Sequence, residues 1–263
     1  MLTAATQRQI ADELYAAERD RVPIAPLVGR YEGIGAADAY QIQLLNIARR
    51  VAGGATVIGH KVGLSSAAMQ QMMGVDEPDY GHLLDDMRVT GPADVTRYCF
   101  PRVEPEVGFI LGADLPGEGC TEDDVLAATE AVAPALELID SRIRDWTIAL
   151  ADTISDNASS AGFVLGEARV KPSDLDLTAI DVALYCGDEL LATGRSDAVL
   201  GNPVTSVAWL ARKVASFGVQ LKAGHVILPG SCTRAYDVRP GEVFRGEFTG
   251  LGNVTLTCEG SAG

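Results

Sequence analysis

Three glutamates in two apolar segments are the residues of this chain best suited to chemistry. Glu104 and Glu106 lie in Arg102–Leu111, where apolar and other residues alternate as they do in a strand. Residues two apart on a strand share a face, so both carboxylates project to one side and repel each other unless a cation or solvent lies between them. The pair indicates either a solvated strand face or the start of an oxygen-ligand site for Mg²⁺ or Mn²⁺.

A metal site of this kind would need a third carboxylate, and Glu137 is the candidate. It interrupts an apolar run formed by Ala135, Leu136, Leu138 and Ile139, which is typical of a buried strand. An ionised glutamate inside such a run is unfavourable unless it is paired or coordinated. The sequence therefore favours a metal centre built from Glu104, Glu106 and Glu137 about as strongly as it favours a solvated face.

Two further side chains could take part in acid–base chemistry. Lys61 lies in a short β-rich run, 56–64, with glycines on both sides, and glycine lets a ligand approach the backbone closely. Asp79 lies in a segment with the composition of a loop, where its simplest interpretation is a turn residue. Residues 152–160 are rich in hydroxyl and amide groups, which suit either a loop or an anion-binding wall.

Composition limits the classes of partner. The 263 residues carry 21 Lys and Arg against 36 Asp and Glu, a net charge of −15, and no basic cluster, so we expect no nucleic-acid binding. No apolar run reaches the length of a membrane span and no signal peptide is evident, so we expect a cytoplasmic protein that binds no membrane. The five cysteines are scattered, which indicates neither a disulfide framework nor a zinc site.

The elements that must position these residues form two regions. Helices are expected at 3–20 and 36–52, and we interpret residues 1–55 as an N-terminal helical appendage with a packing role. Residues 56–263 form the main domain, with helices expected at 66–73, 121–132 and 205–217. Strands are expected at 180–186, 189–193, 225–228, 233–238, 243–248 and 253–258. Many strands with few helices predict an α+β protein built on a mixed, rolled sheet.

Seven short motifs follow one another along the chain. They are Gly59-His-Lys-Val-Gly-Leu64, Asp79-Tyr-Gly81, Glu104-Pro-Glu106, Glu137-Leu-Ile-Asp-Ser-Arg142, Ile143-Arg-Asp-Trp146, Asp156-Asn-Ala-Ser159 and Leu200-Gly-Asn-Pro203. In this order they resemble the motifs of the 2-hydroxypenta-2,4-dienoate (2-oxopent-4-enoate) hydratases. This family belongs to the hydratase/decarboxylase branch of the fumarylacetoacetate hydrolase superfamily, and the resemblance covers nearly the whole chain.

The resemblance implies a fumarylacetoacetate-hydrolase-like mixed β-roll as the catalytic domain, 56–263, in a homo-oligomer. It implies Mg²⁺ or Mn²⁺ held by Glu104, Glu106 and Glu137, with Lys61 and Asp79 as the catalytic pair. The substrate-binding residues that it implies are Leu64, Arg142, Ser159 and Ser160. Many relatives have cysteine at the position of Ser160, a difference that we expect to alter packing or polarity without removing activity.

The implied reaction adds water to a small anionic 2-hydroxydienoate and yields a 4-hydroxy-2-oxoalkanoate, in the catabolism of aromatic or steroid rings. Asp79 would activate the water at C4, while Lys61 would stabilise the enolate or relay a proton. Association with a decarboxylase or aldolase of the same pathway is possible for such an enzyme.

Three alternatives remain open. A 4-oxalocrotonate decarboxylase would share the metal and the lysine, but relatives with that activity typically have an apolar residue in place of Asp79. An acylpyruvate-type C–C hydrolase would rely on a His–Glu pair; His60 and His82 flank the site motifs, although we expect structural roles for His60 and His225. A non-catalytic, partner-binding descendant would have lost a metal carboxylate or Lys61, and all of these are present.

Overall fold

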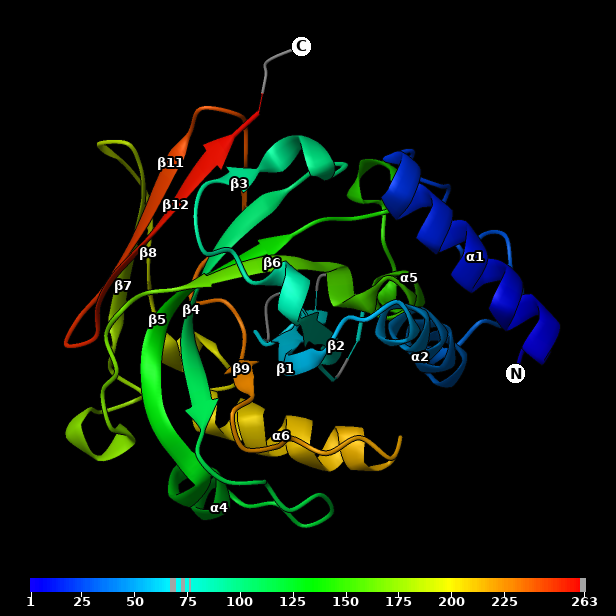
Figure 1. The fold of residues 1–263 in the computed structure, drawn as a ribbon. Helices are drawn as coiled ribbons and strands as arrows, with labels where there is room; N and C mark the ends of the chain where they lie inside the picture. The colour runs from blue at the N-terminus through cyan, green and yellow to red at the C-terminus, as the bar shows by residue number, and fades with distance from the viewer. Residues whose placement is uncertain (67–69, 72–73, 76, 261–263) are drawn as a thin grey trace.

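The computed structural model describes residues 1–263 except 67–69, 72–73, 76 and 261–263 (Figure 1). Within these residues, one sheet has the strand order β2-β1-β9-β4-β5-β6, with β10 also pairing with β4. Its strands are β1 (Val57–Gly63), β2 (Asp79–Leu84), β4 (Arg102–Leu111), β5 (Thr129–Ile139), β6 (Ser160–Leu165), β9 (Val226–Leu228) and β10 (Tyr236–Asp237). The β1–β9 pair is parallel and the other pairs are antiparallel, so the sheet is mixed.

A second sheet has the order β3-β12-β11-β7-β8 and covers one side of the first (Figure 1). Its strands are β3 (Ala93–Asp94), β7 (Asp181–Cys186), β8 (Glu189–Arg195), β11 (Val243–Phe248) and β12 (Gly252–Glu259). Leu136 of β5, Phe244 of β11 and Leu256 of β12 belong to one buried cluster that joins the two sheets. The predicted α+β class with mixed, rolled sheets is confirmed.

Within the described ranges the α-helices are α1 (Ala4–Asp20), α2 (Ala36–Ala52), α4 (Glu122–Ala128), α5 (Leu150–Ser155) and α6 (Pro203–Ala215). Helix α6 begins at an asparagine N-cap followed by proline, and it buries Val207 and Leu210 in the main core. Helices α1 and α2 lie on the opposite side of the molecule from β7, β8, β11 and β12 (Figure 1). None of the helices in the described ranges is long and apolar enough to span a bilayer.

The two N-terminal helices pack on each other and on the main domain. Ile10 of α1 and Ile42 of α2 share a buried cluster with Ile143, which lies beyond β5. Tyr40 of α2 stacks on Tyr80 of β2 with ring centroids 4.5 Å apart. The boundary after residue 55 stays a prediction, but the helices before it contribute side chains to the core around the sheet.

Two local expectations were wrong. The helix expected over 121–132 ends at Ala128, because the following residues pair with β4, with Val132 opposite Phe109. Tertiary pairing here outweighs local helix propensity. Asp79 was placed in a loop, yet it begins β2 and is buried opposite Gly63 of β1. The helix expected at 66–73 includes residues outside the described ranges.

Candidate metal centre and active site

The pairing of β4 with β5 brings the three glutamates together. Glu104 lies directly opposite Glu137 in the antiparallel register, and Glu106 follows two residues later on the same face of β4. One carboxylate oxygen from each residue can be chosen so that all three lie within 4.8 Å of one another. Glu106 and Glu137 are completely buried and Glu104 is partly buried. The geometry is that of a three-carboxylate ligand set.

Burial makes this cluster unfavourable without a cation. It raises the pKa of Glu106 well above its ordinary value, with help from the charges of Glu137 and Glu104. Burial likewise raises the pKa of Glu137, against the opposing effect of Lys61. The pKa of Glu104 rises to about 7, again mainly through burial. Ionisation of all three carboxylates is therefore unfavourable unless a positive charge lies beside them.

Several carboxylate oxygens are left for a ligand. Glu106 Oε2 accepts a hydrogen bond from the backbone nitrogen of Gly230 at 2.7 Å. Within the part of the chain that the structure describes, Glu106 Oε1 and both oxygens of Glu137 accept no hydrogen bond. Buried carboxylate oxygens without donors are the hard ligands that Mg²⁺ and Mn²⁺ prefer. The residues present therefore fit a divalent ion.

Lys61, on β1, supplies a buried positive charge beside the cluster. Its Nζ lies 3.4 Å from Glu137 Oε2 and donates a hydrogen bond to the carbonyl oxygen of Ala158 at 2.9 Å. Burial alone would lower the pKa of Lys61. The carboxylates of Glu137 and Asp79 raise this pKa by more than burial lowers it, so the net shift is upward. The ammonium group therefore stays protonated and acts as a fixed cation.

A left-handed turn presents the acceptor for Lys61. Asn157, Ala158 and Ser159 have φ values of 55°, 50° and 56°, a region that is unfavourable for residues other than glycine. The side chain of Asn157 holds this turn against β2, since it accepts from the backbone nitrogen of His82 at 2.8 Å and donates to its carbonyl at 2.9 Å. The turn thereby directs the Ala158 carbonyl towards Lys61. Backbone strain of this kind gathers at functional sites.

Asp79 lies near Lys61, beside Gly63. Its Oδ2 accepts a hydrogen bond from Thr153 Oγ1 at 3.0 Å, whereas Oδ1 is buried with no partner among the described residues. A Cβ atom on Gly63 would lie 2.2 Å from Asp79 Oδ1 and 3.4 Å from Lys61 Nζ, so any larger residue here would displace the Asp79 carboxylate. Burial raises the pKa of Asp79, and Lys61 and Thr153 oppose that rise. A carboxylate with a raised pKa is a stronger base than an ordinary aspartate.

Lys61, Asp79 and Glu104 line one cavity of about 570 Å³. Its wall has a charged part and an apolar part, the second suited to a short hydrocarbon tail. The charged part includes Lys61, Asp79 and Glu104, and the apolar part includes Val62, Leu64, Ile139 and Ile148. The cavity can therefore hold a small molecule with one anionic end and one apolar end.

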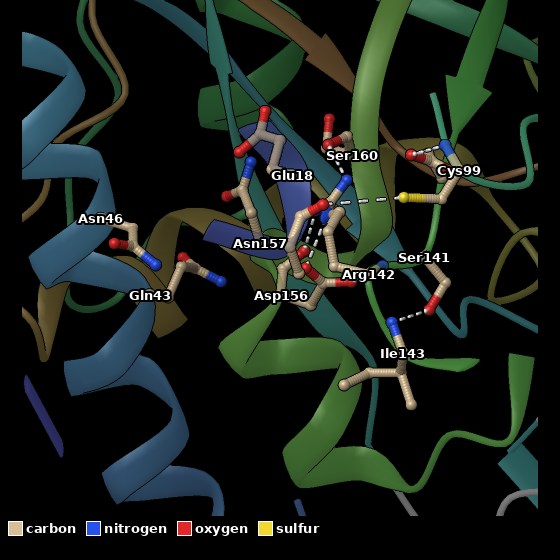
Figure 2. A network of polar contacts seen from close by, with 12 residues as sticks. Glu18, Gln43, Asn46, Cys99, Ser141, Arg142, Ile143, Asp156, Asn157 and Ser160 are labelled. Atoms are coloured by element: carbon tan, nitrogen blue, oxygen red, sulfur yellow. Dashed lines mark hydrogen bonds and ion pairs between the residues drawn. The ribbon is translucent and has the colours of Figure 1, made fainter. Parts of the chain in front are cut away.

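Of the residues predicted to bind substrate, Leu64 and Ser159 line this cavity, and Ser159 Oγ has no partner within the described residues. Arg142 and Ser160 do not line it. Arg142 is buried and its donors are used inside the protein: Nε reaches Asp156 Oδ1 at 2.5 Å and Nη2 reaches the Asp156 carbonyl at 2.6 Å (Figure 2). Arg142 thus supports the chain before the left-handed turn, and direct contact with substrate stays a prediction for both Arg142 and Ser160.

Sequence reasoning marked the segments 56–64 and 152–160 but did not single out Gly63 or Thr153 as parts of the site. Thr153 is separated from Asp79 by 74 residues, so no local pattern connects them. The histidines, in contrast, lie where structural roles were expected: His60 is fully buried, with its ring centroid 4.7 Å from that of His82 and 5.7 Å from that of His225. No histidine of the described chain lines the cavity, so it contains no His–Glu pair.

Comparison with solved structures identifies the class of protein. The 4-oxalocrotonate decarboxylase from Pseudomonas putida G7, solved with magnesium and adipate, superposes with a TM-score of 0.93 and 34% identity, over 98% of this chain and 99% of that chain. More distant structures named for fumarylacetoacetate hydrolase share the fold alone. The chain has the fold of the fumarylacetoacetate hydrolase family proteins.

Within this fold class, the similarity to curated relatives identifies the family of the chain. The 2-keto-4-pentenoate hydratase of Paraburkholderia xenovorans (strain LB400) is 42% identical over 261 residues, covering 98% of this chain and 97% of the relative. The 2-oxo-hept-4-ene-1,7-dioate hydratase of Escherichia coli is 41% identical over 258 residues, covering 95% and 97%. No family model matches the chain. The chain belongs to the 2-keto-4-pentenoate hydratase family of hydro-lyases.

Proposed function

We propose that this enzyme adds water to 2-hydroxypenta-2,4-dienoate, or to a short alkyl homologue, and forms a 4-hydroxy-2-oxoalkanoate in the catabolism of aromatic or steroid rings. The observation that carries the proposal is a buried carboxylate, Asp79, that shares one cavity with Lys61 and with Glu104 of the glutamate cluster. Hydration needs a base for water as well as a charged site for the anionic end of the substrate. The apolar part of the cavity wall suits a short tail.

The residues Glu104, Glu106 and Glu137 would hold Mg²⁺ or Mn²⁺, which when bound supplies Lewis acidity to the oxygens at the carboxylate end of the substrate. Lys61 adds a fixed positive charge at the same end. Because its ammonium group is already oriented by the Ala158 carbonyl, it needs little reorganisation to stabilise negative charge on the enol oxygen. The enol proton leaves, C5 gains a proton, and the substrate becomes a 2-oxo-3-enoate.

Asp79 serves the second half of the reaction. C4 of the 2-oxo-3-enoate is electrophilic, because the C3=C4 double bond is conjugated with the 2-oxo group. As the water oxygen bonds to C4, the C3=C4 π electrons move toward the 2-oxo group, and Asp79 Oδ1 takes a proton from the water. Protonation of C3 then completes the 4-hydroxy-2-oxoalkanoate. The free Oδ1, buried beside Lys61, is the oxygen available for this transfer.

One assay tests the proposal. The purified protein is given 2-hydroxypenta-2,4-dienoate and its methyl homologue, with Mg²⁺, with Mn²⁺ and with a chelator. We expect metal-dependent loss of the dienol absorbance and a 4-hydroxy-2-oxoalkanoate as product. Product formation at an equal rate in chelator, or no hydration of either compound, would contradict the proposal.

Decarboxylation is the second candidate, because the solved 4-oxalocrotonate decarboxylase matches the fold so closely. It needs the metal site and Lys61 but no base for water, so it would leave Asp79 without a task. Adding 4-oxalocrotonate to the same assay separates the two reactions, since only decarboxylation releases carbon dioxide. The homo-oligomeric state, the cytoplasmic location and an association with a pathway decarboxylase or aldolase remain predictions, and light scattering on the purified protein tests the first.

A further inference from the structure

The two oxygens of the Asp79 carboxylate have different surroundings. Oδ2 accepts the hydrogen bond from Thr153, and Oδ1 faces the space beside Gly63 that Lys61 Nζ also approaches. One oxygen is therefore held by a neutral donor, and the other is left to react. The hydrogen bond from Thr153 favours this orientation of the carboxylate plane.

Without that donor, Asp79 would have a competing orientation. The carboxylate is completely buried, so solvent offers it little compensation, and the charge of Lys61 is the strongest attraction nearby. Rotation towards Lys61 would bring both oxygens under the influence of the ammonium group. A carboxylate paired in this way is a weaker base and no longer presents a free oxygen to water.

Thr153 is well placed to prevent this rotation because its own position is fixed. It is buried in α5, and Asp152 beside it accepts hydrogen bonds from the backbone nitrogens of Ala149 at 2.9 Å and Leu27 at 2.5 Å. The helix that carries Thr153 is thus tied at its first turn to the N-terminal region. Its hydroxyl cannot follow Asp79 if the carboxylate turns.

Gln43 of α2 ties the same helix to the strand that carries Asp79. Its Nε2 donates to the carbonyl of Tyr80 at 2.9 Å and to the carbonyl of Ile154 at 2.8 Å, the residues that directly follow Asp79 and Thr153. Gln43 is buried, and its side chain projects from α2 towards the segment of Asp156 and Asn157 (Figure 2). Strand β2 and helix α5 are therefore held at a set separation.

We propose that Thr153 is a positioning residue that orients Asp79 so that Oδ1 faces the water that adds to C4. The proposal rests on the proposed function, in which Asp79 is the base for hydration. Thr153 acts through Asp79 and has no separate task in forming the 2-oxo-3-enoate. Its loss should slow hydration and leave that earlier step in place.

The test compares Thr153→Val, Thr153→Ser and Asp79→Asn, with Thr129→Val as a matched control. Thr129 is also buried, and its hydroxyl donates to the Val125 carbonyl at 2.7 Å, away from the cavity. Each variant is assayed with 2-hydroxypenta-2,4-dienoate and Mn²⁺, and the ratio of 4-hydroxy-2-oxopentanoate to 2-oxopent-3-enoate is measured. Urea unfolding checks that each variant is folded.

We expect Thr153→Val to lower kcat for hydration about tenfold or more, because small errors in the position of a reacting group are costly. KM should change little, and 2-oxopent-3-enoate should accumulate. Thr153→Ser should restore hydration, since it keeps the hydroxyl, and Thr129→Val should match the parent. Adding Thr153→Val to Asp79→Asn should cause no further decrease in kcat for hydration, since Thr153 acts only through Asp79.

Two outcomes overturn the proposal. One is a folded Thr153→Val enzyme that hydrates at the parental rate while Asp79→Asn does not; the function of Asp79 then stands and only the positioning role fails. The other is a folded Thr153→Ser enzyme as impaired as Thr153→Val, which assigns the effect to packing of the methyl group. If Asp79→Asn itself hydrates at the parental rate, Asp79 is not the base for hydration, which is a separate result from a failure of the positioning role alone.

Discussion

Glu104 and Glu137 are direct partners in the antiparallel pairing of β4 and β5. Like charges opposite each other destabilise a sheet, and here a third carboxylate, Glu106, lies on the same face. The strand pair therefore maintains an arrangement that is unfavourable by itself and favourable when a cation binds. This relationship is the physical reason to expect a strong response to metal removal.

The first prediction concerns Glu106→Gln. The change removes one ligand charge but keeps the side-chain size and an acceptor for the Gly230 nitrogen. We expect a folded protein that has lost measurable Mn²⁺ binding in titration calorimetry and at least about a hundredfold in turnover. Glu130→Gln, at an exposed position of β5, is the control and should bind Mn²⁺ normally. A folded Glu106→Gln enzyme with parental activity in chelator would show that the cluster holds no essential metal.

The second prediction concerns Lys61→Ala. Loss of the buried ammonium group should reduce turnover by about 10²-fold or more, the usual scale for an acid–base or charge-stabilising group. Formation of the 2-oxo-3-enoate should slow as well as hydration, because Lys61 acts at the end of the substrate where charge develops first. Stopped-flow absorbance follows that step directly. Lys171→Ala, at an exposed position, is the control, and equal rates in both variants would remove Lys61 from the mechanism.

The third prediction concerns Asp79→Asn. The amide cannot accept the proton of water, so hydration should fall by about 10²-fold or more. Conversion of the dienol to the 2-oxo-3-enoate should continue, since the glutamate cluster and Lys61 remain. Product analysis by NMR distinguishes the two compounds. Asp174→Asn, on the exposed surface, should behave as the parent. Parental hydration in Asp79→Asn would leave Asp79 with a structural role only.

The fourth prediction concerns pH and His82. Burial, followed by the charge of His225, lowers the pKa of His82 to about 4. An unfolded histidine has a pKa of about 6.5. Above this pH, His82 is neutral in both states and does not lower the free energy of unfolding. As the pH falls from about 6.5 towards 4, only the unfolded state takes up the proton, so the free energy of unfolding decreases. At pH 5 the loss should be about 2 kcal/mol relative to neutral pH.

The variant His82→Gln isolates this effect, because the buried carboxylates titrate in both proteins and cancel in the difference. Urea unfolding of the metal-free parent and variant at pH 7.5 and pH 5 gives that difference. It should move by about 2 kcal/mol in favour of the variant on acidification. A difference that does not vary with pH would show that His82 takes up protons equally in both states.

The sequence was informative where chemistry follows strand periodicity. The i, i+2 spacing of Glu104 and Glu106, and the isolation of Glu137 in an apolar run, predicted three carboxylates that the structure does bring within 4.8 Å. Asp79 was misplaced because its neighbours have loop composition, and only pairing with β1 makes that segment a strand. Thr153 could not be found, because its contact with Asp79 depends on how α5 packs. Arg142 was predicted to bind substrate because it lies in a motif of the family. In the structure its Nε and Nη2 groups donate hydrogen bonds to Asp156 instead.

Strand β9 has a consequence for the order in which the protein forms during synthesis. It comes from the last sixth of the chain, yet Val226 and Ile227 lie between β1 and β4 and pair with both. Lys61 and the carboxylates of β4 are therefore joined in one sheet only after more than 220 residues have been made. A nascent chain would carry both halves of the site without connecting them. Folding should be slow and dominated by distant contacts, and a ribosome-bound fragment ending before β9 should pair β4 with β5 without placing Lys61 beside them.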